Sequence, residues 1–315
     1  MRAAVIEGYG GVDRLQVREM ADPSPGPGQL LVQVMAAGLN PLDAKVRQGS
    51  MRFIQPVKFP WVPGYELAGV VAAVGPEVSG FVPGDAVHGN VKGGACAGLA
   101  LLDESAAAPK PERLSFAEAA AVPVAALTAW QGLLGRGELA AGERVLINGG
   151  AGGVGHFAVQ IAAALGAHVT AVASGRHQDF LRELGAERTL DYGRDDFTRD
   201  EETFDVVFDV AATSDFTACD LILGEGGVYV TTLPGPAVFF RAALTAVAGL
   251  FGKARRARWV ILRPRAADLV NVDRLIEQGR VRPVVDRVFP LDEIRAAHQA
   301  IESGHARGKM VVRVG

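Results

Sequence analysis

The sequence is poor in cysteine and in surplus charge of either sign. It contains two cysteines among 315 residues, Cys96 and Cys219, and neither belongs to a C-x-x-C pair. A disulfide scaffold and a cysteine-rich structural zinc site are therefore excluded. Lys and Arg total 32 against 35 Asp and Glu, and the formal net charge is −3. No strong overall field would attract nucleic acid or an anionic membrane.

Long hydrophobic runs and a secretion signal are also missing. The most apolar stretch, residues 238–252, is interrupted by Arg241 and falls short of the roughly 20 residues that cross a bilayer. The first residues, MRAAVIEGYGG, contain one arginine and lack the long apolar core of a signal peptide. We therefore expect a cytoplasmic protein.

Glycine, in contrast, is abundant. There are 39 glycines in 315 residues, which is above the usual share of roughly 7%. No G-x-y period runs through the chain, which excludes collagen, and an apolar content of 49% argues against disorder. The glycines are expected to serve turns and close backbone approaches in a folded protein.

The chain divides into two regions of different composition. The first 120 residues are rich in proline and carry short β-branched runs, such as 30–36 and 69–74, which favour a compact β-rich domain. After residue 122 strands alternate with helices, which indicates βαβ units and a mostly parallel sheet. Strands are expected at 144–148, 168–173, 204–210, 227–232 and 259–262, and helices at 116–122 (with Ser115 as N-cap), 124–134, 155–165, 178–184, 216–223 and 266–278. The end of the chain returns to β character, with a strand at 310–314.

The loop NGGAGGVG, residues 148–155, follows the strand RVLIN and opens the next helix. Within it lies G-x-G-x-x-G, which indicates dinucleotide binding when a strand precedes it and a helix follows; a chance glycine cluster would lack that context. Gly150 would make a tight turn, Gly152 would let the backbone approach a pyrophosphate, and Gly155 would let the helix pack closely on the sheet. The predicted cofactor contacts in this loop are Gly150, Gly152, Gly153, Val154 and Gly155.

The next strand indicates which dinucleotide is bound. An NAD site usually carries Asp or Glu about 20 residues after the glycine loop, to bond the ribose hydroxyls. Here that position reads Ala173-Ser174-Gly175-Arg176, without an acid. Ser174 and Arg176 would bond a 2′-phosphate, which favours NADP(H). The alternative is a solvated loop in which Arg176 only begins a helix.

Several motifs occur in an order that is typical of a known protein family. They are AAGLNPLDAKVRQG (36–49), PGYELAGVVAAVG (63–75), VPGDAV (82–87), AAAVPVAALTAWQGL (119–133), INGGAGGVGHFAVQIAAALGA (147–167), LGAERTLDY (184–192) and GHARGKMVVRV (304–314). Over its whole length the chain resembles the medium-chain dehydrogenase/reductase superfamily, and within it the zinc-independent quinone oxidoreductase branch. The resemblance implies an α/β protein with a GroES-like β-barrel substrate domain, residues 1–121 completed by 281–315. A Rossmann domain with a doubly wound parallel sheet, residues 122–280, would bind the dinucleotide, with the active site in the cleft between the domains.

The same resemblance bears on zinc. Zinc-using relatives have a Cys where this chain has Asn40, and Gly-His-Glu where it has Gly64-Tyr65-Glu66. Neither Asn nor Tyr is a good zinc ligand, so we expect no metal. The family further implies cofactor contacts at Thr128, Tyr192 and Leu233, although each side chain has a purely structural alternative.

Without a metal, plain alcohol oxidation is disfavoured. Hydride transfer to a quinone or an activated alkene is easier, because the negative charge develops on a conjugated oxygen that the protein need only meet with a hydrogen-bond donor. The candidate catalytic residues are Asn40, also a predicted cofactor contact, and Tyr65. The structural alternatives are that Asn40 starts a turn before Pro41 and that Tyr65 is only a packed aromatic.

The sequence therefore predicts an NADPH-dependent reductase of quinones or α,β-unsaturated carbonyls. The alternative is an NADPH-binding protein with a regulatory or structural role and little turnover, because the glycine loop would look the same in both. The family suggests a homodimer joined through edge strands of the Rossmann sheet near Trp259. The segment 236–258 is divergent and would shape the substrate pocket or a subunit contact. A membrane-surface role for residues 252–258 is a weaker alternative.

Overall fold

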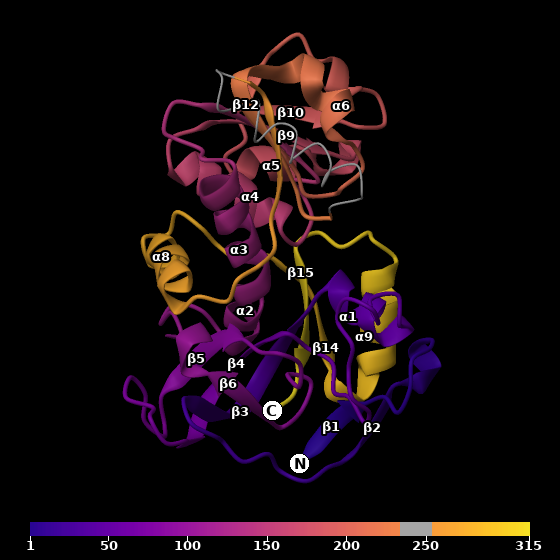
Figure 1. The fold of residues 1–315 in the computed structure, drawn as a ribbon, viewed down its shortest axis with the longest axis vertical. Coiled ribbons are helices and arrows are strands. Elements are labelled where there is room, and N and C mark those ends of the chain that lie inside the picture. Colours follow the sequence, from indigo (N-terminus) through magenta and orange to yellow (C-terminus); the bar gives the residue numbers. More distant parts are fainter. Residues whose placement is uncertain (234–253) are drawn as a thin grey trace. The chain divides into compact units, whose positions relative to one another are not determined.

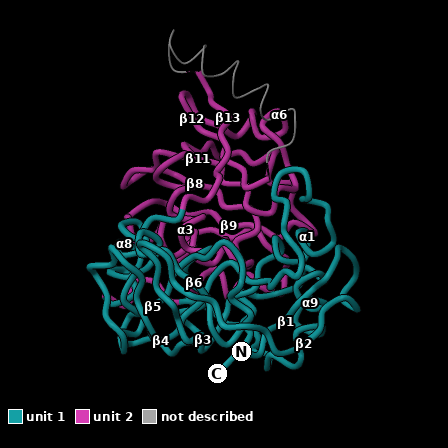
Figure 2. The backbone as a smooth tube through the Cα atoms, turned by 60° about the horizontal axis from the view of Figure 1, so that its bottom comes forward, with its two compact units in different colours: residues 1–124, 264–277, 283–315 teal, residues 125–263, 278–282 magenta. Residues whose placement is uncertain are grey.

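The computed structural model describes residues 1–233 and 254–315, and the chain divides into two compact units (Figures 1 and 2). Unit 1 comprises residues 1–124, 264–277 and 283–315, and unit 2 comprises residues 125–263 and 278–282. Residues 264–277 group with unit 1, whereas the sequence assigns them to the second domain. The apolar stretch 238–252 and most of the divergent segment lie outside the described residues.

Unit 1 is built on a seven-stranded, largely antiparallel sheet. Its strands follow the order β14-β15-β3-β4-β5-β7, and β6 also pairs with β3. They are β3 (Gln29–Leu39), β4 (Glu66–Val74), β5 (Ala86–Asn90), β6 (Leu99–Asp103), β7 (Ala107–Pro109), β14 (Val285–Pro290) and β15 (Lys309–Arg313). A separate antiparallel pair is formed by β1 (Arg2–Val5) and β2 (Gln16–Glu19). Along β3 Leu30, Val32 and Val34 alternate inward, so one face of the strand joins the core.

Four α-helices lie wholly within unit 1. They are α1 (Pro41–Gln48), α2 (Phe116–Ala120), α8 (Ala266–Glu277) and α9 (Ile294–Glu302). Ser115 is the N-cap of α2, as predicted: its Oγ accepts the Glu118 amide at 3.3 Å, and a Glu118 carboxylate oxygen accepts the Ser115 amide at 2.9 Å. This reciprocal capping explains why a helix of five residues forms at that position.

The described residues of unit 2 form a six-stranded sheet in which every pairing is parallel, in the order β10-β9-β8-β11-β12-β13. The strands are β8 (Arg144–Asn148), β9 (His168–Ala173), β10 (Arg188–Asp191), β11 (Phe204–Asp209), β12 (Leu223–Thr231) and β13 (Arg256–Trp259). The predicted alternating α/β domain is confirmed. The strand predicted at 259–262 lies three residues earlier, because its pairing with residues 228–231 of β12 selects that register.

The helices of unit 2 follow the strands, apart from α3 (Pro123–Trp130), which begins at the end of unit 1. Among the residues of unit 2 that the structure describes, they are α4 (Gly155–Ala164), α5 (Gln178–Glu183) and α6 (Phe216–Cys219). The helix predicted at 124–134 is α3 continued by a π-helix over Gln131–Arg136. Gly166 and Gly185 have φ of +82° and +104°, so they end α4 and α5 in the left-handed conformation that glycine adopts most easily.

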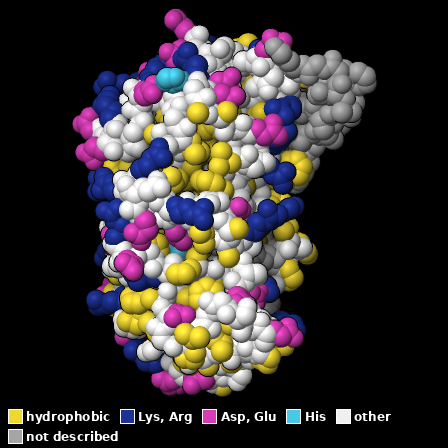
Figure 3. Space-filling model, turned by 90° about the vertical axis from the view of Figure 1, so that its left-hand side faces the viewer, with side chains coloured by type: hydrophobic (Ala, Val, Ile, Leu, Met, Phe, Trp, Pro, Cys, Tyr) yellow, Lys and Arg dark blue, Asp and Glu magenta, His cyan; other side chains and the backbone are white. Residues whose placement is uncertain are grey.

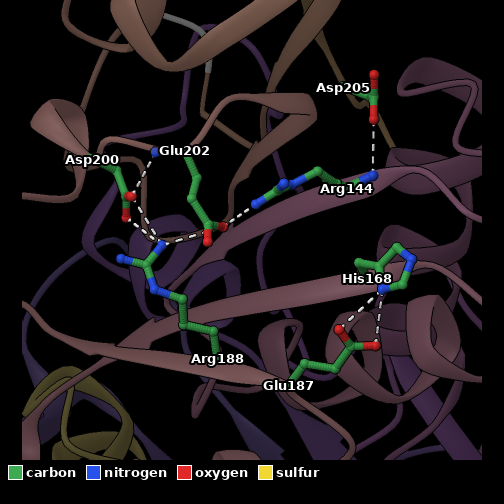
Figure 4. A network of polar contacts seen from close by, with 7 residues as sticks. All are labelled: Arg144, His168, Glu187, Arg188, Asp200, Glu202 and Asp205. Atoms are coloured by element: carbon green, nitrogen blue, oxygen red, sulfur yellow. Dashed lines mark hydrogen bonds and ion pairs between the residues drawn. The ribbon is translucent and has the colours of Figure 1, made fainter.

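The amino ends of the parallel strands carry a network of charged side chains (Figure 4). Arg188 contacts Asp200 at 2.8 Å and Glu202 at 3.5 Å, and Arg144 pairs with the same Glu202. His168 lies 3.0 Å from Glu187. Ligands of open α/β sheets bind at the opposite, carboxyl edge, so this network has a structural role.

No described helix is long and apolar enough to span a bilayer. On the face drawn in Figure 3, basic and acidic side chains are interspersed rather than gathered by sign. This mixture of basic and acidic side chains is consistent with the small net charge of the sequence, −3.

Candidate active site

The glycine loop joins β8 to α4 at the carboxyl edge of the unit 2 sheet. Gly149 has φ of +85°, and the amides of Gly149 and Gly150 both donate to the carbonyl of Val172, at 3.0 and 2.9 Å. The left-handed turn is therefore made by Gly149, not by Gly150 as the motif predicts. Both bonds hold the loop against the end of β9.

The other glycines are required by close contacts or leave open space. A Cβ on Gly150 would lie 2.9 Å from the Leu181 side chain, and one on Gly155 would lie 2.0 Å from the Gly149 carbonyl oxygen. A Cβ on Gly152 would meet only the same oxygen, at 3.4 Å. Gly150 and Gly155 thus pack the loop tightly, while Gly152 leaves its surface bare. The amides of Gly152 and His156 already donate within the loop, to the carbonyls of Gly149 and Gly152 at 3.1 and 3.0 Å. The bare backbone at Gly152 and the positive end of the α4 dipole together fit a pyrophosphate.

The loop after β9 holds two predicted cofactor contacts. Ser174 is half-buried, and Arg176 is exposed on the short 3-10 turn Gly175–His177. The amide of Tyr192 donates to the Ala173 carbonyl at 3.2 Å, so Tyr192 lies beside the end of β9 and its side chain is 65% exposed. The structure therefore brings the segments of Ser174, Arg176 and Tyr192 together at one corner of the sheet.

A carboxylate that the spacing argument missed lies at the same corner. Asp191 pairs with Ala173 across β10 and β9, and a Cβ on Gly175 would lie 2.5 Å from its Oδ2. Its Oδ1 accepts the Gly193 amide at 3.0 Å. This acid belongs to the neighbouring strand β10. It therefore does not stand about 20 residues after the glycine loop, where the sequence pattern places it. Only the pairing of β10 with β9 reveals it.

A buried polar network joins the carboxyl ends of β8, β11 and β12. Asn148 Nδ2 donates to Asp209 Oδ1 and to Thr213 Oγ1, both at 2.8 Å. Asp209 Oδ2 accepts the Ser214 amide at 2.9 Å and the Tyr229 hydroxyl at 3.0 Å. Burial raises the pKa of Tyr229, so its hydroxyl stays a donor. The network fixes the strand ends that border the glycine loop. The sign of this network in the sequence is that two apolar strands each end in a polar residue.

Two further predicted contacts lie elsewhere in unit 2. Thr128 is half-buried on α3. Leu233 lies two residues beyond β12, its side chain is 52% exposed, and its amide bonds Thr231 Oγ1 at 3.4 Å. Leu233 is therefore on the same edge of the sheet as the glycine loop, and both residues stay predicted cofactor contacts.

In unit 1, Asn40 lies between β3 and α1 and is only 6% exposed. Its Nδ2 donates to Glu66 Oε1 at 2.9 Å, and its Oδ1 accepts from Lys309 Nζ at 2.6 Å. Lys309 Nζ also donates to Glu66 Oε1 at 2.7 Å and to the Leu39 carbonyl at 2.9 Å. Asn40 is thus one member of a buried cluster that the sequence did not predict.

Asp43 connects the two candidate catalytic segments. Its Oδ2 accepts the backbone amide of Asn40 and its Oδ1 accepts that of Gly64, both at 2.8 Å. Complete burial raises the pKa of Asp43 to about 7, against the lowering effect of these two hydrogen bonds and of Lys309. Since Gly64 precedes Tyr65, this carboxyl group ties the Asn40 segment to the Tyr65 segment.

Tyr65 is 6% exposed and belongs to the core of unit 1. Its hydroxyl oxygen accepts a hydrogen bond from Gln55 Nε2 at 2.8 Å. Burial raises the pKa of Tyr65, with a smaller contribution from Asp43. The phenol is therefore neutral near pH 7 and keeps its own hydrogen for donation.

The donor chemistry at these positions does not fit a zinc ion. Asn40 Oδ1 is occupied by an ammonium group, and the neutral Tyr65 phenol is a poor ligand. Burial holds the pKa of the Cys96 thiol well above its usual range, so it does not supply a thiolate. Among the described residues, no group of three or more His, Cys, Asp or Glu side chains is arranged to hold a metal.

Two domain families match the chain. Residues 26–131 match the alcohol dehydrogenase GroES-like domain, and residues 184–312 match the domain named zinc-binding dehydrogenase. The first match covers most of the strands of the unit 1 sheet. The predicted α/β fold, with a GroES-like domain and a Rossmann-type parallel sheet, is confirmed.

Individual proteins are similar over the whole chain. The chain is 35% identical to the chloroplastic quinone-oxidoreductase homolog of Spinacia oleracea, across 99% of this chain and 98% of that protein. It is 35% identical to the chloroplastic NADPH-dependent alkenal/one oxidoreductase of Arabidopsis thaliana, across 99% and 79%. The solved quinone oxidoreductase from Coxiella burnetii matches with a TM-score of 0.87 and 32% identity, covering 100% of this chain and 99% of that one. The similarity therefore spans both units.

Proposed function

Because the chain belongs to the medium-chain dehydrogenase/reductase superfamily, in its quinone oxidoreductase branch, we propose that it is a zinc-independent, NADPH-dependent reductase. Membership makes it an oxidoreductase that uses a nicotinamide cofactor and a small-molecule substrate. The proposed substrates are quinones and α,β-unsaturated carbonyls. The proposed cytoplasmic location and homodimer stay predictions; the molecular mass in solution would test the dimer.

One observation carries the substrate proposal: the two candidate catalytic side chains are neutral, nearly buried hydrogen-bond donors. Asn40 and Tyr65 are each 6% exposed, and neither suits a metal. A donor without a metal stabilises charge best when that charge is already spread over a conjugated system. Quinones and enones meet this requirement, and simple ketones do not.

Different residues of this chain would have different roles in the reaction. The backbone at Gly152 and the start of α4 would hold the pyrophosphate, and the bound nicotinamide would supply the hydride. An N–H of Asn40 or the O–H of Tyr65 donates to the substrate oxygen on which negative charge develops. The Tyr65 hydroxyl then gives its proton to the reduced substrate and regains one from solvent.

Ser174 and the exposed Arg176 support the preference for NADPH, because both would donate to a 2′-phosphate. Asp191 favours NADH as a second candidate, because a carboxylate beside Gly175 would bond ribose hydroxyls and repel a phosphate. The ratio of kcat/KM for the two cofactors decides between them. Arg176→Ala should raise KM for NADPH and leave KM for NADH unchanged, whereas Arg182→Ala, which removes an exposed arginine paired with Asp179, should change neither.

The activity itself is tested by following NADPH oxidation at 340 nm with quinones, enones and simple ketones, before and after dialysis against a chelator. We expect turnover of quinones or enones, none of simple ketones, and no loss on chelation. Tyr65→Phe should lower kcat by more than about tenfold while cofactor binding stays intact. NADPH binding without turnover of any compound would favour the regulatory or structural role instead, and an unchanged kcat would remove Tyr65 from the mechanism.

A further inference from the structure

Lys309 is bonded entirely inside unit 1. Its side chain is 3% exposed, and its ammonium group donates to Leu39 O, Asn40 Oδ1 and Glu66 Oε1 at 2.6–2.9 Å. An ammonium group has three N–H bonds, so its donors match these three acceptors one for one. Because lysine only donates, the atom of Asn40 that faces it must be the oxygen. The orientation of the Asn40 amide is therefore fixed by chemistry.

Glu66 completes this arrangement through both of its carboxylate oxygens. Its Oε1 accepts from Asn40 Nδ2 at 2.9 Å as well as from Lys309, and its Oε2 accepts the Val124 amide at 2.7 Å. Gly38 leaves the space that the carboxylate occupies, since a Cβ there would lie 2.5 Å from Glu66 Oε1. Both charged partners of Asn40 are thus buried, paired and anchored to the backbone.

These contacts leave the Asn40 amide with a single donor to offer. One of its two N–H bonds points to Glu66, and its oxygen is held by Lys309. Within the described part of the chain the second N–H has no protein acceptor. A donor whose direction is fixed before a ligand arrives stabilises developing charge without the cost of reorienting it.

We propose that Lys309 and Glu66 are positioning residues that hold the Asn40 amide so that one N–H is presented to an oxygen of the bound substrate or cofactor. Neither charged side chain touches the reacting atoms; both act through Asn40. The expected change in kcat rests on the proposed reductase function. The orientation of the Asn40 amide does not depend on it.

The orientation of the amide can be observed directly, because the chain has only four asparagines, at positions 40, 90, 148 and 271. In protein labelled with 15N in asparagine alone, the signals lost in Asn40→Ala identify the Asn40 side chain. Lys309→Met should shift or broaden these signals and leave those of Asn148 and Asn271 in place. Unchanged Asn40 signals in a folded Lys309→Met protein would overturn the proposal, whether or not any substrate is turned over.

Kinetics test whether the orientation matters. We expect Asn40→Ala and Lys309→Met each to lower kcat by roughly 10–100-fold, with the same change in KM for NADPH in both, and the double variant to be no slower than Asn40→Ala alone. Losses that multiply in the double variant would show that Lys309 does not act through Asn40. Lys110→Met is the matched control, because Lys110 also donates to two backbone carbonyls of unit 1, and it should keep full kcat.

Lys309→Met leaves the Glu66 carboxylate buried without its partner, which destabilises the folded state. Lys309→Met/Glu66→Gln removes both charges and serves if Lys309→Met does not fold, with the same expected amide shifts and the same fall in kcat. Lys309→Arg keeps a cation and should recover part of the lost kcat. If the wild-type protein reduces no compound of the panel, the proposed function fails, and the Asn40 signals still decide the positioning role.

Discussion

His298 on α9 is a buried histidine whose two ring nitrogens have no hydrogen-bond partner among the described residues. Burial, and to a lesser extent the Arg47 guanidinium, lower its pKa to about 3. In the unfolded chain His298 has its ordinary pKa near 6.5. Between pH 6.5 and pH 3 the unfolded state therefore binds a proton that the folded state does not bind. The stability that His298 contributes is present above pH 6.5 and is lost as the pH falls toward 3.

We therefore predict that His298→Phe reduces the loss of stability in acid. Between pH 6.5 and pH 4.5 the wild-type protein should lose up to about 1.4 kcal/mol more per pH unit than the variant. Urea unfolding at several pH values measures this, and the same substitution at exposed His305 serves as the control. Parallel pH profiles of wild type and His298→Phe would contradict the assignment of acid sensitivity to this ring.

Among single residues, a local motif predicts the site residue but not its partners. Asn40 was predicted because it lies in a motif of adjacent residues. Its partners Glu66 and Lys309 lie 26 and 269 positions away, and only the pairing of β15 with β3 and of β3 with β4 brings them together. Local patterns predict which residue types gather at a site, but the hydrogen bonds that orient them depend on non-local strand pairing.

Among whole elements, prediction succeeded where the local pattern dominates. The strand 144–148 and the strand 168–173 have the predicted bounds, because each is a β-branched run bordered by loop residues. Strand β6 was not predicted and β13 was displaced by three residues, since both are defined by a partner strand, β3 and β12. The bounds of a strand at the edge of a sheet follow its neighbour more than its own sequence.

The glycine loop makes a prediction at the scale of the β8–loop–α4 element. Gly152→Ala adds a Cβ whose nearest contact is 3.4 Å, so the fold should tolerate it while the pyrophosphate loses its close approach. We expect at least a tenfold higher Kd for NADPH and a nearly unchanged Tm. Gly155→Ala places a Cβ 2.0 Å from a backbone oxygen and should cost more than about 2 kcal/mol of stability.

Gly135→Ala is the control for both substitutions. Gly135 lies in the π-helix after α3, and a Cβ there would meet nothing within 4 Å. It should leave Kd unchanged and keep or slightly raise Tm. Calorimetric binding and thermal unfolding measure the three variants side by side. If Gly152→Ala bound NADPH as tightly as wild type, the cofactor phosphates would not lie on this loop.

At the scale of the molecule, each unit has a hydrophobic cluster of its own. One cluster gathers unit 1 side chains such as Leu30, Val32 and Leu67, and another gathers unit 2 side chains such as Leu146 and Val207. A unit with its own core can in principle fold alone. The chain nevertheless crosses between the units several times, because unit 1 is assembled from residues 1–124, 264–277 and 283–315.

A hydrophobic cluster within each unit predicts two unfolding transitions, of which NADPH raises mainly one. The chain has three tryptophans, Trp61 in unit 1 and Trp130 and Trp259 in unit 2. Trp61→Phe leaves fluorescence only in unit 2, and Trp130→Phe/Trp259→Phe leaves it only in unit 1. All predicted cofactor contacts except Asn40 lie in unit 2, so NADPH at 100 times its Kd should stabilise the unit 2 transition by about 2.7 kcal/mol.

The Trp61 signal should then keep a midpoint in urea that NADPH changes little, and far-UV circular dichroism should follow both transitions in turn. If both variants gave one midpoint and NADPH moved it equally in each, the two units would unfold as a single cooperative body. In that case the stability changes expected for His298→Phe in unit 1 and Gly155→Ala in unit 2 would be read by either tryptophan set. With separate transitions, each substitution changes only the midpoint reported from its own unit.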